Sequence, residues 1–285
     1  MRAFTVILAA ILLCPSVFAQ KELLRPTWMA GKVYKHENVT ETDATLPGGG
    51  GSQKSTMTQE FLTRVTAEPG TGHKLAEMTF AAVKATVKMG DQSISYDSAD
   101  PAKSPPFFQQ TFGAIVGRSF VLVYDKNDAY LEARGLEKLA ATPLGGTTAM
   151  DGKQLSEAMR KSQEAGLPKS PVAPGDTWTY DEKIELPPMG AIAIKVKGTY
   201  NSNLVKDGRK LARLLLQGTF EAPPGNAEMK IESGSKFTGE VHFDLERRAV
   251  TSQEVRLELK MGLQGQQVPL MQSVAMKLVS VEDAK

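Results

Sequence analysis

Alternation of apolar and polar residues runs through the second half of the chain and restricts it to strand-rich folds. In two segments the apolar residues occupy every second position: Val241, Phe243 and Leu245, then Val255, Leu257, Leu259 and Met261. Successive side chains of a strand point to opposite faces, so this period places one face against a core and the other in water. The pattern is typical of antiparallel sheets.

Short turns rich in glycine, proline and aspartate separate the apolar segments of the first half. They include Glu68 to Gly72, Gly90-Asp91 and Asp125 to Asp128. Turns of this kind between apolar runs predict β-hairpins. We therefore predict a mainly β fold: a curved, half-barrel-like antiparallel sheet with two or three short helices packed on it or between its units.

Two stretches depart from the strand pattern and predict helices. The first, over 105–116, opens with two prolines and repeats apolar residues at helical spacing: Phe108, Phe112 and Ile115. The second, over 152–165, carries Leu155 and Met159 on one face. These helices are either plain core or a lid over an apolar pocket, since phenylalanine and methionine suit lipid-like ligands. The candidate ligand-lining residues are Phe108, Phe112, Ile115, Leu155 and Met159.

Composition divides the chain into five segments. They are a signal peptide (1–19), a loose lead-in (20–27), a first β unit (28–141), a linker with the second helix (142–174) and a second β unit (175–285). Three short matches in the same order indicate related units: Gly31–Tyr34 with Gly175–Tyr180, Gly72–Ala76 with Gly208–Ala212, and Val121–Asp125 with Val241–Asp244. The alternative is chance similarity between hairpins.

The N-terminus has the order of a secretory signal peptide. Arg2 precedes an apolar run over 6–13, and small or apolar residues lead to Ala19. The run is shorter than the roughly 20 apolar residues that span a bilayer. We expect cleavage between Ala19 and Gln20, and a periplasmic or secreted protein from a bacterial host.

Residue usage excludes several kinds of site. The single cysteine, Cys14, lies in the signal behind Leu13, which disfavours lipid attachment there, so the mature chain would have no disulfide and no thiolate metal site. The three histidines are not closely spaced, and no Gly-x-Ser-x-Gly motif occurs. We predict no catalytic residue, no metal and no cofactor, hence a non-enzymatic protein.

The charge pattern excludes other partners. The formal net charge is +2, and lysines and arginines alternate with acids, unlike the basic stripe of a nucleic-acid binder. No apolar run in the mature chain approaches membrane-spanning length, so we expect no transmembrane span.

The order of motifs resembles a family of uncharacterised exported bacterial proteins. The matching segments are Gly31–Tyr34, the hairpin Gly117–Asp125, and Leu167-Pro168 with Pro174–Trp178. The architecture of that family is similar to lipoprotein-localisation and mycobacterial lipid-carrier proteins, in which helices lie over the concave face of a half-barrel. The resemblance implies a hydrophobic-ligand or envelope-lipid role and carries over no catalytic residue.

Three function classes follow from these observations. The leading hypothesis is an exported, non-enzymatic β-sheet protein that binds a hydrophobic small molecule or lipid between sheet and helices. The alternative is a cell-envelope structural or interaction protein that meets a protein partner through exposed strand edges, without a small-molecule ligand. The third is a hydrolase of envelope polymers, which requires clustered carboxylates in a cleft.

Overall fold

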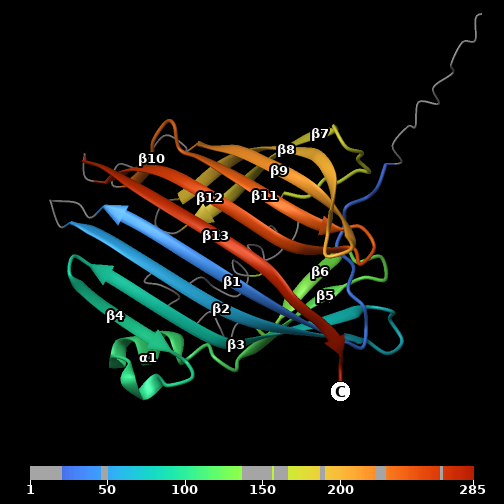
Figure 1. The fold of residues 1–285 in the computed structure, drawn as a ribbon, viewed down its shortest axis with the longest axis horizontal. Helices are drawn as coiled ribbons and strands as arrows, with labels where there is room; N and C mark the ends of the chain where they lie inside the picture. The colour runs from blue at the N-terminus through green and yellow to red at the C-terminus, as the bar shows by residue number, and fades with distance from the viewer. Residues whose placement is uncertain are drawn as a thin grey trace, which may run out of the picture.

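In the computed structural model, the described residues form one antiparallel sheet of thirteen strands with a short α-helix beside it (Figure 1). The structure describes residues 21–45, 51–136, 156, 166–186, 190–221, 229–263 and 266–285. The predicted signal with Ala19 and Gln20 lies outside these residues. So does the predicted helix over 152–165, including Leu155 and Met159 but not Ser156.

The first half of the chain forms a meander that branches at its third strand. Its strands are β1 (Lys32–Thr45), β2 (Ser52–Ala67), β3 (Lys74–Met89), β4 (Gln92–Asp97), β5 (Ser119–Tyr124) and β6 (Tyr130–Arg134). One edge of β3 pairs with β2 along its length, and the other pairs with β4 at one end and β5 at the other. A 3-10 turn, η2 (Pro101–Lys103), and the helix α1 (Pro106–Phe112) connect β4 to β5.

The second half forms another meander. Its strands are β7 (Thr177–Leu186), β8 (Gly190–Lys206), β9 (Arg209–Glu221), β10 (Met229–Ile231), β11 (Lys236–Asp244), β12 (Ala249–Leu263) and β13 (Gln266–Asp283). Short β10 pairs with the far end of β12, and the others pair in chain order.

The two halves join because the first and last strands pair. The β1–β13 register runs from Lys32 opposite Asp283 to Ala44 opposite Leu270. The strand order is therefore β6-β5-β3-β2-β1-β13-β12-β11-β9-β8-β7. Among the described strands β6 and β7 are free edges, so the sheet is open, and its β7–β9 end curls back behind β11 and β12 (Figure 1).

The three sequence echoes fall at corresponding points of the two meanders. They lie at the starts of β1 and β7, the starts of β3 and β9, and the ends of β5 and β11. The turns after β5 and β11 are also alike, since the carboxylates of Asp125 and Asp244 each accept backbone N–H groups. Each turn holds a non-glycine residue with positive φ, Asp128 at 62° and Arg248 at 52°.

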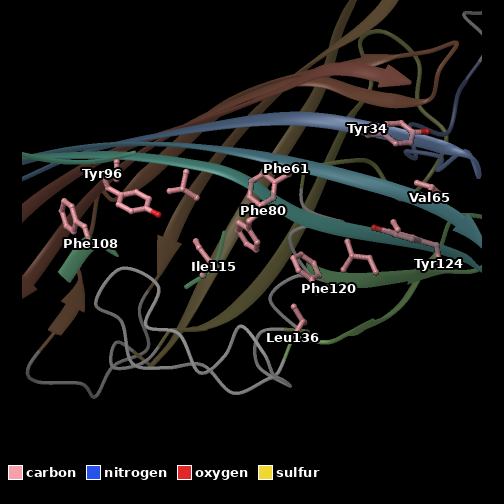
Figure 2. Close-up of a cluster of buried hydrophobic side chains, with 14 residues drawn as sticks. Tyr34, Phe61, Val65, Phe80, Tyr96, Phe108, Ile115, Phe120, Tyr124 and Leu136 are labelled. Carbon is pink, nitrogen blue, oxygen red and sulfur yellow. The ribbon is translucent and has the colours of Figure 1, made fainter. Parts of the chain in front are cut away.

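Two hydrophobic cores lie on the inner face of the sheet. The first packs β2, β3 and β5 against α1 and the turn after it, and includes Phe61, Phe80, Phe108, Ile115, Phe120 and Tyr124 (Figure 2). The second packs β8, β9 and β11 against segments outside the strands, and includes Leu24, Val172, Tyr200, Leu214, Val241 and Phe243. Fully burying one such side chain contributes about 1.5–3 kcal/mol.

The helix α1 ends at Phe112, whereas the sequence pattern predicts a helix to Val116. Gly113 follows, its backbone N–H bonded to the Gln109 carbonyl, and residues 113–117 are turns. Glycine is a poor helix former, which accounts for the early end. Phe108 and Ile115 are 9% and 0% exposed, so side chains fill the space between α1 and the sheet.

Candidate functional site

A cavity of about 210 Å³ lies between the two cores, and we call it the inter-core cavity. Tyr34 and Phe61 of the first core and Val241 of the second core line it. Its other lining residues are Pro26, Thr27, Trp28, His36, Asn38, Thr63, Met78, Leu167, Ala249, Val250, Gln253 and Met276. None of these described lining residues is lysine, arginine, aspartate or glutamate, so the walls are apolar with a few neutral polar groups.

Residues 21–30, which we call the strap, close one side of the inter-core cavity. The strap bonds to the turns after β5 and β11: the Trp28 backbone N–H donates to Asp128 Oδ1 (2.9 Å), and that of Thr27 donates to the Arg248 carbonyl (2.8 Å). Glu22 and Val172 exchange backbone hydrogen bonds of 2.8 and 2.9 Å. The sequence predicts a loose lead-in over 20–27, whereas the structure holds the described part of it at both halves of the sheet.

Side chains strengthen the attachment of the strap to the turn after β5 and to the turn after β11. Both carboxylate oxygens of Asp128 lie 2.7 Å from Nζ of Lys74, and the Asp128 side chain is 7% exposed. On the other side, Arg248 Nη2 donates to the Leu23 carbonyl at 2.8 Å. Trp28 packs edge-on against Tyr34, with ring centroids 5.0 Å apart. The strap is therefore a built wall of the cavity.

Polar side chains in the inter-core cavity lack partners. Thr63 is completely buried, and its Oγ1 has no hydrogen-bond partner among the described residues; the same holds for the buried Oδ1 of Asn38. An unsatisfied buried polar group costs about 1–3 kcal/mol, so such groups are normally bonded to protein, water or ligand. These two atoms therefore mark places where something other than the described chain is expected to bind.

His36 lies between these two groups on the inner face of β1. Burial lowers the pKa of His36 to about 4, so its imidazole is neutral at pH 7. Its ring lies parallel to that of Tyr34, with an interplanar angle of 9° and centroids 6.5 Å apart. Burial also raises the pKa of Tyr34, whose hydroxyl accepts the Met29 backbone N–H at 3.1 Å.

Acid is expected to destabilise the protein through His36. In the unfolded chain His36 is protonated as the pH falls below its ordinary pKa of 6.5. In the folded protein the same imidazole stays neutral until about pH 4, so the proton stabilises the unfolded chain between these two values. The stability lost over this window approaches about 3 kcal/mol. Urea unfolding between pH 4 and 8 measures it: His36→Gln is expected to flatten the profile, and parallel profiles for variant and wild type would contradict the assignment.

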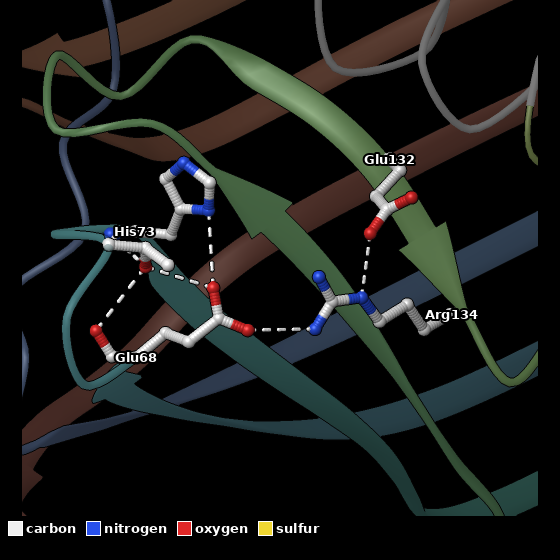
Figure 3. Close-up of polar contacts among 5 residues, drawn as sticks. Glu68, His73, Glu132 and Arg134 are labelled. Carbon is white, nitrogen blue, oxygen red and sulfur yellow. Dashed lines mark hydrogen bonds and ion pairs between the residues drawn. The ribbon is translucent and has the colours of Figure 1, made fainter.

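A polar cluster at the end of the β2–β3 hairpin is structural (Figure 3). Glu68 accepts hydrogen bonds from Arg134 Nη1 (3.0 Å) and Thr71 Oγ1 (2.9 Å), and its Oε2 lies 3.2 Å from Nδ1 of His73. These hydrogen bonds, that of Arg134 first, hold the pKa of Glu68 below its usual range. The cluster ties the hairpin turn to the edge strand β6.

His242 belongs to a second polar cluster, on the outer face. Its Nδ1 lies 3.0 Å from Ser252 Oγ and its Nε2 lies 2.9 Å from Glu240 Oε1. Ser252 and Arg213 are its direct cross-strand neighbours, so sheet register alone produces this ladder. Sequence spacing brings Glu68 near His73 and Glu240 near His242, but not Arg134 or Ser252, which strand pairing adds. No group of three or more metal-ligating side chains occurs within the described ranges.

Of the residues predicted from sequence to line a ligand site, the described ones, Phe108, Phe112 and Ile115, do not line the inter-core cavity, and Leu155 and Met159 lie outside the described residues. Phe108 and Ile115 are buried in the first core, and Phe112 packs against it. Their contact with a ligand stays a prediction, as does that of Leu155 and Met159. Sequence reasoning missed Thr63 and Asn38, although both share strand parity with buried aromatic residues, and a polar residue at such a position is a usable signal.

Part of a solved lipovitellin structure has a similar fold. The structure described as "Lipid-protein interactions in lipovitellin" matches with a TM-score of 0.54 and 8% identity, covering 91% of this chain and 26% of that one. This chain thus spans about a quarter of that protein. Weaker matches are a β-barrel-like protein of DUF1849 from Brucella abortus (TM-score 0.23, 10% identity, 88% and 98% covered) and a putative outer membrane lipoprotein-sorting protein domain from Vibrio parahaemolyticus (0.17, 9%, 88% and 86%).

Other comparisons concern sequence. A search among curated proteins returned no match. In the described part of the chain no helix has the length and apolar character to cross a membrane. A family model matches residues 71–247, from the β2–β3 turn to the turn after β11, and the chain therefore belongs to DUF6263, a family of unknown function.

Proposed function

We propose that this protein is exported and binds a hydrophobic, lipid-like small molecule on the inner face of its sheet, without catalysing a reaction. The inter-core cavity carries the proposal, because concave sites with apolar and aromatic walls and a few polar groups are typical of small-molecule binding. The features of a signal peptide at the N-terminus support export to the periplasm or the medium.

An apolar stripe continues the inter-core cavity along the sheet. Gln253 and Met276 line the cavity as a cross-strand pair, and Val255 and Val274 are the next inward-facing pair. We call five half-buried apolar residues on the inner face of β12 and β13 the stripe: Val255, Leu257, Leu259, Leu270 and Val274; the polar residue Gln272, opposite Leu257, lies among them. They belong to neither core as far as the chain is described.

The stripe has the dimensions of a lipid tail. Counted from Gln253 of the inter-core cavity to Leu259 at the end of the stripe, the apolar path extends about 20 Å along β12, at about 3.4 Å per residue. Covering it with a ligand would remove apolar surface from water, at about 25 cal/mol for each Å². The likeness to lipovitellin adds support of a limited kind, because at 8% identity it concerns the fold alone.

Filling the inter-core cavity is expected to weaken ligand binding. The neutral fluorophore N-phenyl-1-naphthylamine is expected to bind the wild type and to be displaced by long-chain lipids. Val250→Trp places an indole in the cavity and should weaken binding at least tenfold, whereas Val279→Trp, at a 48% exposed position outside it, should not. Fluorescence titration measures both, with circular dichroism to verify folding. Equal binding of the fluorophore by both variants, or no binding by the wild type, would contradict the proposal.

A second candidate is an envelope protein that meets a protein partner through a strand edge. Ten-residue β7 pairs only with β8 among the described strands, and a long free edge is a template for strand addition. If the protein acts in this way, crosslinking in the native host should capture a stable protein complex. Native mass spectra of the purified chain should then show no bound lipid.

A further inference from the structure

We infer that the ligand of the inter-core cavity is an uncharged lipid whose polar end carries hydroxyl or amide donors, held beneath the strap by Thr63 and Asn38. The inference rests on the proposed function and narrows it to one chemical class of ligand and one orientation.

The lining of the inter-core cavity argues against a charged head group. No described lining residue is charged, and the nearby charges of Lys74 and Asp128 neutralise each other at 2.7 Å. His36, the one imidazole among the described lining residues, is half-buried, and its lowered pKa keeps it neutral near pH 7. A carboxylate or phosphate entering this space would lose its hydration without contacting a charged residue of the described lining, which is unfavourable. A neutral polar group meets no such penalty.

The unpartnered atoms define what the neutral polar end must offer. Asn38 Oδ1 accepts hydrogen bonds and donates none, so it requires a donor. Thr63 Oγ1, fully buried, both donates and accepts, so a ligand hydroxyl satisfies it in either direction. Hydroxyl or amide groups on the ligand therefore match both atoms, whereas a bare hydrocarbon leaves both unsatisfied.

Strand register sets the orientation of the ligand. Thr63 lies opposite Tyr34, against which Trp28 of the strap packs, whereas Asn38 lies opposite Met276. Tyr34 and Asn38 are about 14 Å apart along β1, at about 3.4 Å per residue. Val274, in the stripe, is the next inward-facing residue of β13 after Met276. The polar end therefore lies under the strap at Thr63, its hydroxyls reach Asn38 through bridging water, and the tail follows the stripe.

Two lipids with the same acyl chain test this inference: monoolein, which is neutral and carries hydroxyls, and oleate, which is anionic. Displacement of N-phenyl-1-naphthylamine at pH 7.5 is expected to show at least tenfold tighter binding of monoolein to the wild type. Equal or tighter binding of oleate would overturn the head-group inference and leave the proposed function standing. Binding of neither lipid, nor of the fluorophore, would overturn the proposed function itself.

Matched variants test the role of Thr63. Thr63→Val keeps the shape and removes the hydroxyl, so it should weaken monoolein binding about tenfold and leave oleate binding unchanged. It should also raise the urea midpoint of the free protein, because an unsatisfied buried hydroxyl is gone. Thr63→Ser keeps the hydroxyl and should keep the tighter binding of monoolein than of oleate. Thr66→Val makes the same change at an exposed position of β2 and is the control, which should also keep it. An unchanged preference in Thr63→Val would overturn the role of Thr63.

Discussion

Asp128→Ala is expected to lower the free energy of unfolding by about 3 kcal/mol, because it removes one partner of a largely buried ion pair. The Lys74 side chain is 23% exposed and would keep its charge without the carboxylate whose two oxygens lie 2.7 Å from Nζ. The Trp28 backbone N–H would lose its acceptor as well. Alanine is also strained at a φ of 62°, by about 1 kcal/mol. Urea unfolding followed by circular dichroism measures the loss.

The matched control for this variant is Asp100→Ala. Asp100 pairs with Lys103 at 2.7 Å, but both side chains are at least 49% exposed, and such pairs contribute about 0–1 kcal/mol. Limited proteolysis supplies a second readout, since only Asp128→Ala should speed cleavage within the strap and weaken binding in the inter-core cavity. Similar losses of unfolding free energy for Asp128→Ala and Asp100→Ala would show that the contact of Asp128 with the strap does not stabilise the protein.

Gly218→Ala is expected to cost about 2–4 kcal/mol, the scale of an overpacked core. Gly218 faces Phe237 across the β9–β11 pair, and an added Cβ would lie 2.1 Å from Cε1 of that ring. The ring can move, but the Lys195 carbonyl oxygen, 2.6 Å from the same Cβ, belongs to the backbone of β8. The strand pairing itself would therefore have to shift.

Two further variants serve as a control and as a second test of this packing. Gln217→Ala changes an exposed neighbour in β9 and should stay within about 0.5 kcal/mol of the wild type. Gly198→Ala should behave like Gly218→Ala, because the ring of Trp178 crosses its Cβ position at 2.1 Å. If Gly218→Ala and Gln217→Ala unfold at the same urea concentration, the close packing of ring against glycine is not a constraint.

Local patterns in the sequence predicted the strands and turns, because their causes are local. The alternation of Val255, Leu257 and Leu259 gives the inner face of β12, and the turn Asp125 to Asp128 joins β5 to β6 as expected. The union of the halves was not predictable in this way. Lys32 pairs with Asp283, which is 251 positions away, and no pattern in either segment predicts that the two strands pair.

The candidate site was harder to predict than the fold, for two physical reasons. Phe108 and Ile115 satisfy the spacing of a lid helix, but the same spacing equally makes a core, and the structure uses it as core. The strap looked loose because backbone groups of residues such as Thr27 hold it, and these bond to turns far along the chain. Side-chain patterns carry no trace of such bonds.

The position of β13 has a consequence for how the molecule is assembled. Its eighteen residues are synthesised after the other described strands, and among these strands only β13 joins β1 to β12. Until they arrive, each half-sheet displays a long unpaired edge, the kind of surface that recruits other chains. The joining contacts also span nearly the whole sequence, which slows folding. Deleting β13 should therefore leave two half-sheets with exposed, aggregation-prone edges rather than a slightly smaller sheet.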